Sequence, residues 1–288
     1  MASDSLVLEA PGVPLDVGGG VGLFDSGLGG LSVLTPLLSR EPCWPSVLIA
    51  DQAHVPYGGR PLDEVRSFAL AQTALLFELG VAQVAMACNI SSATALDEAR
   101  QRHGADRVYG MVEPGCAQAV ARTAAGRVAV LATEGTVRSG AYARQLAELD
   151  PRLQCLALAC PEFVPLVEAG HFSDATALHA VRPYVERVRA FGADVAILGC
   201  THYPHLLPAL QAAAPELIFV DPATTLADAL APGLTAAADP RDPILLTTAD
   251  PARLHQQVRA LYGDALRPTV HAVAWRSLVD AGPSSTVG

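Results

Sequence analysis

Two cysteines occupy matching positions in an internal repeat of the chain. Segments 80–88 and 192–200 both begin with glycine, continue as an apolar run and end in cysteine, which is Cys88 in the first and Cys200 in the second. The residues that follow each cysteine are polar and can begin a helix. A thiol at a helix N-terminus ionises more readily, because the helix dipole and its free N–H groups favour negative charge. Cys88 and Cys200 are therefore the candidates for chemistry, whereas the other four cysteines are better explained as small buried hydrophobes.

Two thiols that face each other across one carbon atom form an acid–base pair. One thiolate removes a proton from one face of the carbon, and the other thiol delivers a proton to the opposite face. The product is the mirror image of the substrate. The paired cysteines thus predict stereoinversion at an acidic carbon.

The segment that follows the first expected strand permits more than one interpretation. The turn-rich segment 25–30 could bind an anion, and Asp25 in it could orient a thiol or an ammonium group. Its Gly27 and Gly29 also open a dinucleotide fingerprint with Asp51 near the ribose-binding distance, but Ser32 stands where the third glycine belongs, so an NAD-dependent oxidoreductase is the weaker interpretation.

The segment after Cys200 contains two histidines, His202 and His205, and could be read as a metal cluster. All three ligands would come from one short stretch with no evident fourth, so we expect no metal here. We interpret His202 as an acid–base or charge partner of Cys200.

Short apolar runs alternate with longer segments of helical period, which is typical of an α/β protein with parallel strands. The repeat extends beyond the cysteines, because 23–27 matches 131–135, and 113–114 matches 221–222. We therefore expect two similar lobes, each a mainly parallel sheet flanked by helices, related by a pseudo-twofold axis with the active site between them. Ligands of such sheets bind at the carboxyl ends of the strands, where both cysteines fall. The expected strands are 21–24, 47–50, 84–87, 108–112, 127–132, 153–159, 195–199 and 217–220, and the expected helices are 62–79, 92–102, 115–123, 139–149, 175–191 and 206–213.

Composition narrows the function classes. The formal charge is −10, all 19 basic residues other than histidine are arginine, and the chain has no lysine. A pyridoxal-phosphate Schiff base and a Walker A loop are therefore excluded, and an acidic chain is not expected to bind nucleic acid or an anionic membrane. Residues 1–20 lack a signal-peptide pattern, so we expect a cytoplasmic protein with reduced thiols.

Several segments together are similar to one family, the cofactor-independent glutamate racemases of the aspartate/glutamate racemase family. The segments that carry this resemblance are 22–30, Asp51 with 55–60, 87–89, 110–115, 131–136, 160–161 with 164–168, and 199–204. They occur in family order and span about 20 to 210 of the chain.

The resemblance implies glutamate racemisation without cofactors, which supplies D-glutamate for peptidoglycan and hence for cell-wall biogenesis and cell shape. Cys88 would act on the D-isomer and Cys200 on the L-isomer, with assistance from Asp25, His202 and, more weakly, Glu168. The expected partners are glutamate and a second copy of the chain in a homodimer. Substrate contacts are expected from Asp25, Ser26, Pro56, Tyr57, Gly58, Asn89, Ile90, Ser91, Thr133, Thr136, Thr201 and His202.

The resemblance also implies that the last segment returns to the first lobe. We therefore expect lobe A to comprise residues 21–112 and 221–275, lobe B residues 113–220, and 1–20 and 282–288 to be loose termini.

One residue departs from the family pattern. Ile90 stands where the family has threonine, and the lost hydroxyl removes one hydrogen bond to a substrate carboxylate, which is worth about 1.5–3 kcal/mol. Ser91 could take its place. Two further alternatives remain at this point: a racemase for aspartate or another amino acid, and a two-lobed amino-acid-binding protein without catalysis.

Overall fold

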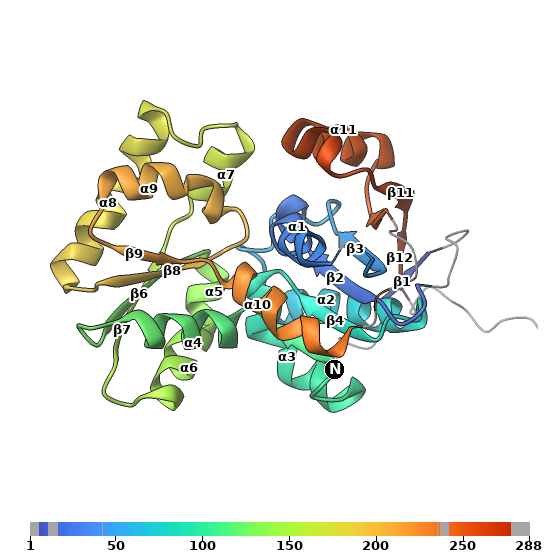
Figure 1. The fold of residues 1–288 in the computed structure, drawn as a ribbon, viewed down its shortest axis with the longest axis horizontal. Helices are drawn as coiled ribbons and strands as arrows, with labels where there is room; N and C mark the ends of the chain where they lie inside the picture. Colours follow the sequence, from blue (N-terminus) through green and yellow to red (C-terminus); the bar gives the residue numbers. More distant parts are fainter. Residues whose placement is uncertain (1–5, 11–16, 42, 235, 237–241, 278–288) are drawn as a thin grey trace, which may run out of the picture.

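The computed structural model describes residues 6–10, 17–41, 43–234, 236 and 242–277. Within them the chain forms two parallel sheets with helices packed on both faces, which confirms the expected α/β class (Figure 1). In the part of the chain that is described, no helix combines the length and the apolar character that a membrane span requires.

Lobe A, as we use the name below, is built on a six-stranded sheet with the order β11-β10-β3-β2-β4-β5. All of its neighbouring strands run parallel. Its strands are β2 (Val21–Asp25), β3 (Ser46–Ala50), β4 (Gln83–Met86), β5 (Val108–Gly110), β10 (Ile244–Thr247) and β11 (Thr269–Ala272). The helices around it are α1 (Leu31–Arg40), α2 (Leu62–Glu78), α3 (Asn89–His103), α10 (Pro222–Leu230) and α11 (Pro251–Tyr262).

Lobe B is built on a four-stranded parallel sheet with the order β7-β6-β8-β9. Its strands are β6 (Arg127–Ala132), β7 (Gln154–Ala159), β8 (Val195–Gly199) and β9 (Ile218–Val220). Its helices are α4 (Val112–Arg122), α5 (Glu134–Ser139), α6 (Ala141–Leu149), α7 (Phe163–Glu168), α8 (Ala175–Phe191) and α9 (Leu207–Ala213), with a 3-10 turn, η2 (Tyr203–Leu206), before α9.

The internal repeat of the sequence is a repeat of topology. The order β3-β2-β4-β5 in lobe A has the same connectivity as β7-β6-β8-β9 in lobe B, so β4 corresponds to β8. Cys88 and Cys200 follow these two equivalent strands. Residues after 240 add β10 and β11 to the edge of the lobe A sheet beside β3.

The central strands consist mostly of apolar residues, which suits a position in the middle of a sheet. Strands β2, β3, β4 and β8 are buried at every position, as expected for parallel strands covered by helices on both faces. The apolar residues of α10 join the lobe A core, while α10 also packs on α4 of lobe B. The lobe boundaries at 112/113 and 220/221 stay a prediction.

The expectation of a loose N-terminus is wrong for one segment. Leu6–Glu9 forms β1, which pairs antiparallel with β12 (Ala274–Ser277). Leu8 is buried in the lobe A core, so the short strand has an apolar anchor that the nearby prolines and glycines concealed. Residues 282–288 lie outside the described part of the chain.

Candidate active site

A cavity of about 420 Å³ lies between residues of both lobes. Both cysteines line it, Cys88 from the end of β4 and Cys200 from the end of β8. Their exposed fractions are similar, 6% for Cys88 and 8% for Cys200. The repeat therefore brings two equivalent, nearly buried thiols to one cavity.

The lobe A side of the cavity holds Cys88 close to a carboxylate. Cys88 is the N-cap residue of α3, and burial, reinforced by the charge of Asp25, raises the pKa of its thiol to about 12. Asp25 is fully buried and accepts hydrogen bonds from the Gly27 N–H at 2.9 Å and from Thr201 Oγ1 at 3.2 Å. Burial raises the pKa of this carboxyl as well. This half of the site therefore favours a protonated thiol at Cys88.

Asn89 begins α3 and lines the cavity. Its Oδ1 accepts a hydrogen bond from Tyr142 Oη at 2.5 Å, which links α3 of lobe A to α6 of lobe B. Its Nδ2 is buried and has no hydrogen-bond partner among the described residues. A buried donor without a partner is costly, so this amide is suited to a ligand acceptor such as a carboxylate.

The lobe B side holds Cys200 close to a cation. His202 Nδ1 lies 4.0 Å from Cys200 Sγ, and His202 Nε2 lies 3.6 Å from Glu168 Oε1. Burial disfavours the charged ring, but its contacts with Cys200 and Glu168 and the charge of Asp25 outweigh burial and raise the pKa of His202 to about 10. The hydrogen bond to His202 in turn lowers the pKa of the half-exposed Glu168. Cys200 therefore has an imidazolium as its neighbour, whereas Cys88 has a carboxylate.

Thr201 connects the two half-sites. Its hydroxyl does not cap the following 3-10 turn, η2, and donates to Asp25 across the lobes instead. Gly29 leaves the space for this contact, because a Cβ at position 29 would overlap Thr201 Oγ1. Asn89 and the following polar residues also do not cap α3 from outside, since the helix already begins at Asn89.

Comparison with known proteins gives the family. Residues 40–230 match the Asp/Glu/hydantoin racemases. The chain belongs to this family.

Several proteins that are similar to this chain are named glutamate racemase. A glutamate racemase from Desulforudis audaxviator (strain MP104C) is 43% identical over 206 residues, which are 71% of this chain and 75% of that protein. The solved glutamate racemase from Thermus thermophilus, in complex with beta-chloro-D-alanine, is 37% identical with a TM-score of 0.78 over 90% of this chain and 98% of that one. The glutamate racemase from Aquifex pyrophilus is 31% identical, with a TM-score of 0.73 over 87% and 98%.

Most of the site residues expected from the racemase resemblance meet at the cavity. Besides the two cysteines, the lining includes Ser26, Pro56, Tyr57, Gly58, Asn89, Ile90, Thr133, Thr136, Glu168, Thr201 and His202. Asp25 and Ser91 are not among the lining residues, and both are fully buried. Asp25 therefore acts on the cavity through its charge and its contact with Thr201.

The structure adds lining residues that the sequence did not single out: Val55, Gly59, Glu134, Cys160, Pro161, Val164, Pro165 and Gly199. All of them lie within segments that carry the racemase resemblance. Cys160 was interpreted as a buried hydrophobe, and it is indeed buried, with a thiol pKa that burial raises. Its segment, 160–161, carries the racemase resemblance, and this was the signal that could have placed it at the cavity.

Ile90 fills the seam between the lobes. It is buried with Tyr57 and Phe68, and a Cβ at Gly135 of lobe B would overlap its Cδ1. The isoleucine thus makes an apolar contact where the racemase family has a hydroxyl. Because Ser91 is buried and not part of the lining, its hydroxyl does not replace the missing one.

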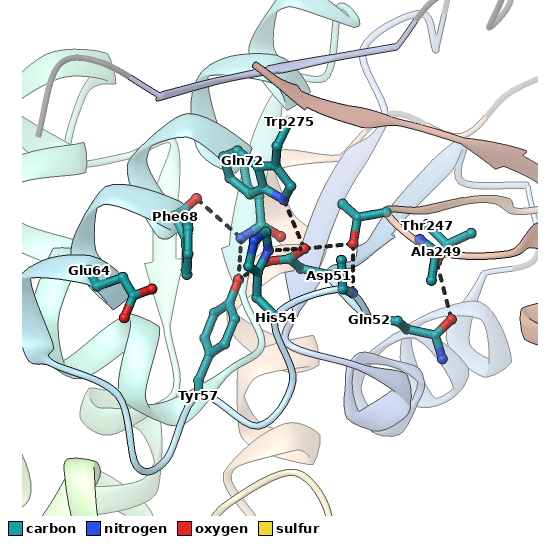
Figure 2. A network of polar contacts seen from close by, with 12 residues as sticks. Asp51, Gln52, His54, Tyr57, Glu64, Phe68, Gln72, Thr247, Ala249 and Trp275 are labelled. Carbon is teal, nitrogen blue, oxygen red and sulfur yellow. Dashed lines mark hydrogen bonds and ion pairs between the residues drawn. The ribbon is translucent and has the colours of Figure 1, made fainter. Parts of the chain in front are cut away.

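The two rival sites are not supported. Asp51 is fully buried and accepts hydrogen bonds from four protein side chains, so it is not free to bind a ribose (Figure 2). Ser32, at the expected third glycine, lies inside α1. Among the described residues, no group of three or more His, Cys, Asp and Glu side chains could hold a metal ion, so Cys200, His202 and His205 are not a zinc cluster.

Proposed function

We propose that the protein interconverts L- and D-glutamate by two-base proton transfer at the α-carbon. The observation that carries the proposal is the pair of thiols, Cys88 and Cys200, at equivalent strand ends of two lobes and in the lining of one cavity. The similar relatives named glutamate racemase support the choice of substrate.

The polar groups of the cavity suit an amino acid with two carboxylates. Among the described residues that line it there is no arginine and His202 is the cationic group, so most donors available to a carboxylate are neutral ones. They are the side chains of Ser26, Asn89, Thr133, Thr136 and Thr201, together with backbone N–H groups near the start of α3. Neutral donors at a helix N-terminus bind carboxylates without neutralising the nearby thiolate.

The charged neighbours on the two sides support a direction for each step. Cys200, as a thiolate beside the His202 cation, removes the α-proton of L-glutamate and becomes a thiol. Cys88, protonated in its more apolar and acidic surroundings, delivers its proton to the opposite face and becomes a thiolate. The reverse sequence converts D-glutamate, so one proton is taken up and one released in each turnover.

The direct test is a cofactor-free incubation of the pure protein with L-glutamate, followed by circular dichroism. We expect the signal to decay to zero as the racemic mixture forms. A flat trace beside an active control racemase would show that the proposal is wrong. The same assay with aspartate tests the alternative substrate, and aspartate turnover without glutamate turnover would replace glutamate.

The biological setting follows from this activity. We propose a cytoplasmic enzyme that supplies D-glutamate for peptidoglycan, and a homodimer as expected from the family resemblance. Light scattering at several protein concentrations measures the assembly, and a mass of one chain at all of them would rule out the dimer.

A further inference from the structure

A second polar centre lies behind the cavity wall, around the carboxylate of Asp51. This side chain has no exposed surface and follows the end of β3. Its oxygens accept hydrogen bonds from Tyr57 Oη at 2.5 Å, Thr248 Oγ1 at 2.7 Å, Trp275 Nε1 at 2.9 Å and His54 Nδ1 at 3.0 Å. Figure 2 shows His54, Tyr57 and Trp275 gathered around the carboxylate. A buried charge is tolerated only when such donors compensate it. The loss of any one donor therefore leaves the Asp51 carboxylate less well compensated.

The donors come from segments that are far apart in the sequence. Tyr57 and His54 belong to the loop after β3, Thr248 follows β10, and Trp275 lies in β12 near the end of the described chain. The indole of Trp275 also packs on Phe68 of α2, with ring centroids 5.1 Å apart. Asp51 therefore ties the C-terminal strands to the loop at residues 54–60.

That loop is both a wall of the cavity and a contact between the lobes. Tyr57 and Gly58 line the cavity, but the Tyr57 hydroxyl is bound to Asp51 and receives a hydrogen bond from Gln72 Nε2 at 3.1 Å. Gly58 O accepts the Gly135 N–H of lobe B at 2.8 Å, and Arg60 O accepts from Arg138 Nη2 at 2.9 Å. The position of the loop thus sets how the wall meets lobe B.

We propose that Asp51 is a positioning residue for substrate binding and that Trp275 and Thr248 act through it. None of the three lines the candidate active site. By fixing the Tyr57 hydroxyl, Asp51 holds Tyr57 and Gly58 at the cavity, and β12 supports the binding of a substrate that it does not touch. This inference rests on the proposed function, because substrate affinity is its readout.

The test compares variants that each remove one donor to Asp51. Trp275→Phe keeps an aromatic ring but lacks the indole N–H, and Thr248→Val lacks the hydroxyl. The control is Trp44→Phe, which alters the other tryptophan of the chain, a residue in the lobe A core outside the Asp51 cluster. We expect KM for both glutamate enantiomers to rise about tenfold in the two variants while kcat stays within about twofold, because binding is weakened and the thiols are intact. The control should keep the wild-type KM.

A double variant separates positioning from a general loss of structure. In a Tyr57→Phe background Asp51 no longer holds the Tyr57 side chain and only His54 of the loop still contacts it, so adding Trp275→Phe should raise KM much less than it does in the wild type. Unchanged KM in both single variants, additive effects in the double variant, or kcat falling as much as KM would each overturn the proposal. If Trp275→Phe does not fold by far-ultraviolet circular dichroism, Thr248→Val decides the question. A wild-type protein that does not racemise glutamate would instead refute the proposed function.

Discussion

The two halves of the cavity are built on the same backbone topology, but the residues next to their cysteines differ in charge. Each presents one nearly buried cysteine after the third strand of the same four-strand unit. In lobe A the neighbour is the buried carboxylate of Asp25, and in lobe B it is His202, whose pKa is raised to about 10. The repeated fold therefore gives the site its symmetry, and the side chains next to the two thiols differ in charge.

Thermodynamics limits how far this difference in charge can affect the kinetics. L- and D-glutamate are mirror images with equal free energies, so kcat/KM must be the same in both directions. The different half-sites can change kcat and KM separately in each direction. They must leave kcat/KM equal in the two directions.

Removing either thiol should have the largest effect. Cys88→Ser and Cys200→Ser each leave one base without its partner acid, and a positioned acid or base contributes about 10²–10⁴-fold to rate. We expect racemisation, followed by circular dichroism, to fall by at least that factor in both variants. Equal folding by far-ultraviolet circular dichroism is the control, and near-wild-type turnover in either variant would rule out the two-thiol mechanism.

Removing the cation should lower kcat/KM equally in both directions but change kcat differently in each. His202→Asn keeps a polar side chain but deletes the charge beside Cys200, and we expect kcat/KM to fall about 10–100-fold, within the range of a charge-assisted interaction. Asp25→Asn is the matched change in lobe A, where it removes the opposite charge. A change in kcat that is the same in both directions for both variants would show that the half-sites are not functionally distinct.

The pH dependence of stability should carry the signature of His202. Its pKa is raised from 6.5 to about 10 in the folded protein, so its contribution to stability is fully present below pH 6.5 and is lost as the pH rises through about 10. Urea unfolding of the wild type and of His202→Asn across this window measures the difference. The gap in unfolding free energy should shrink as the pH rises, and a gap that widens would contradict the assignment.

The hydroxyl that orients Asn89 should affect affinity rather than rate. Tyr142→Phe removes the donor to Asn89 Oδ1 and frees the amide to rotate, so we expect KM to rise about fivefold to tenfold with kcat nearly unchanged. In an Asn89→Ala background the same substitution should change KM no further. Additive effects would mean that Tyr142 does not act through Asn89.

The sequence predicted the halves of this site better than their surroundings. The pairing of Cys88 with Cys200 was readable because the repeat carries both cysteines in register, and α8 was predicted at its observed bounds because Asp174 caps it and Gly192 ends it. Strand β12 was not predicted as an element, because its pairing with β1 and the contact of Trp275 with Asp51 join residues more than 200 positions apart. Charge at the thiols likewise depends on burial and on cross-lobe contacts such as Thr201 with Asp25, which no local pattern encodes.

The smallest expected effect concerns Ile90, on the lobe A side of the seam. Ile90→Thr would return a hydroxyl to the cavity at the cost of the apolar contact with Gly135. One hydrogen bond to a charged group is worth about 1.5–3 kcal/mol, but the loss of buried methyl groups costs about 1 kcal/mol of stability. We therefore expect a severalfold lower KM together with a lower unfolding midpoint, measured by kinetics and thermal denaturation of the same preparation. Ile90→Val is the matched control, because it shortens the side chain without adding a hydroxyl. A KM that falls equally in both variants would show that space rather than hydrogen bonding limits substrate binding on this side of the cavity.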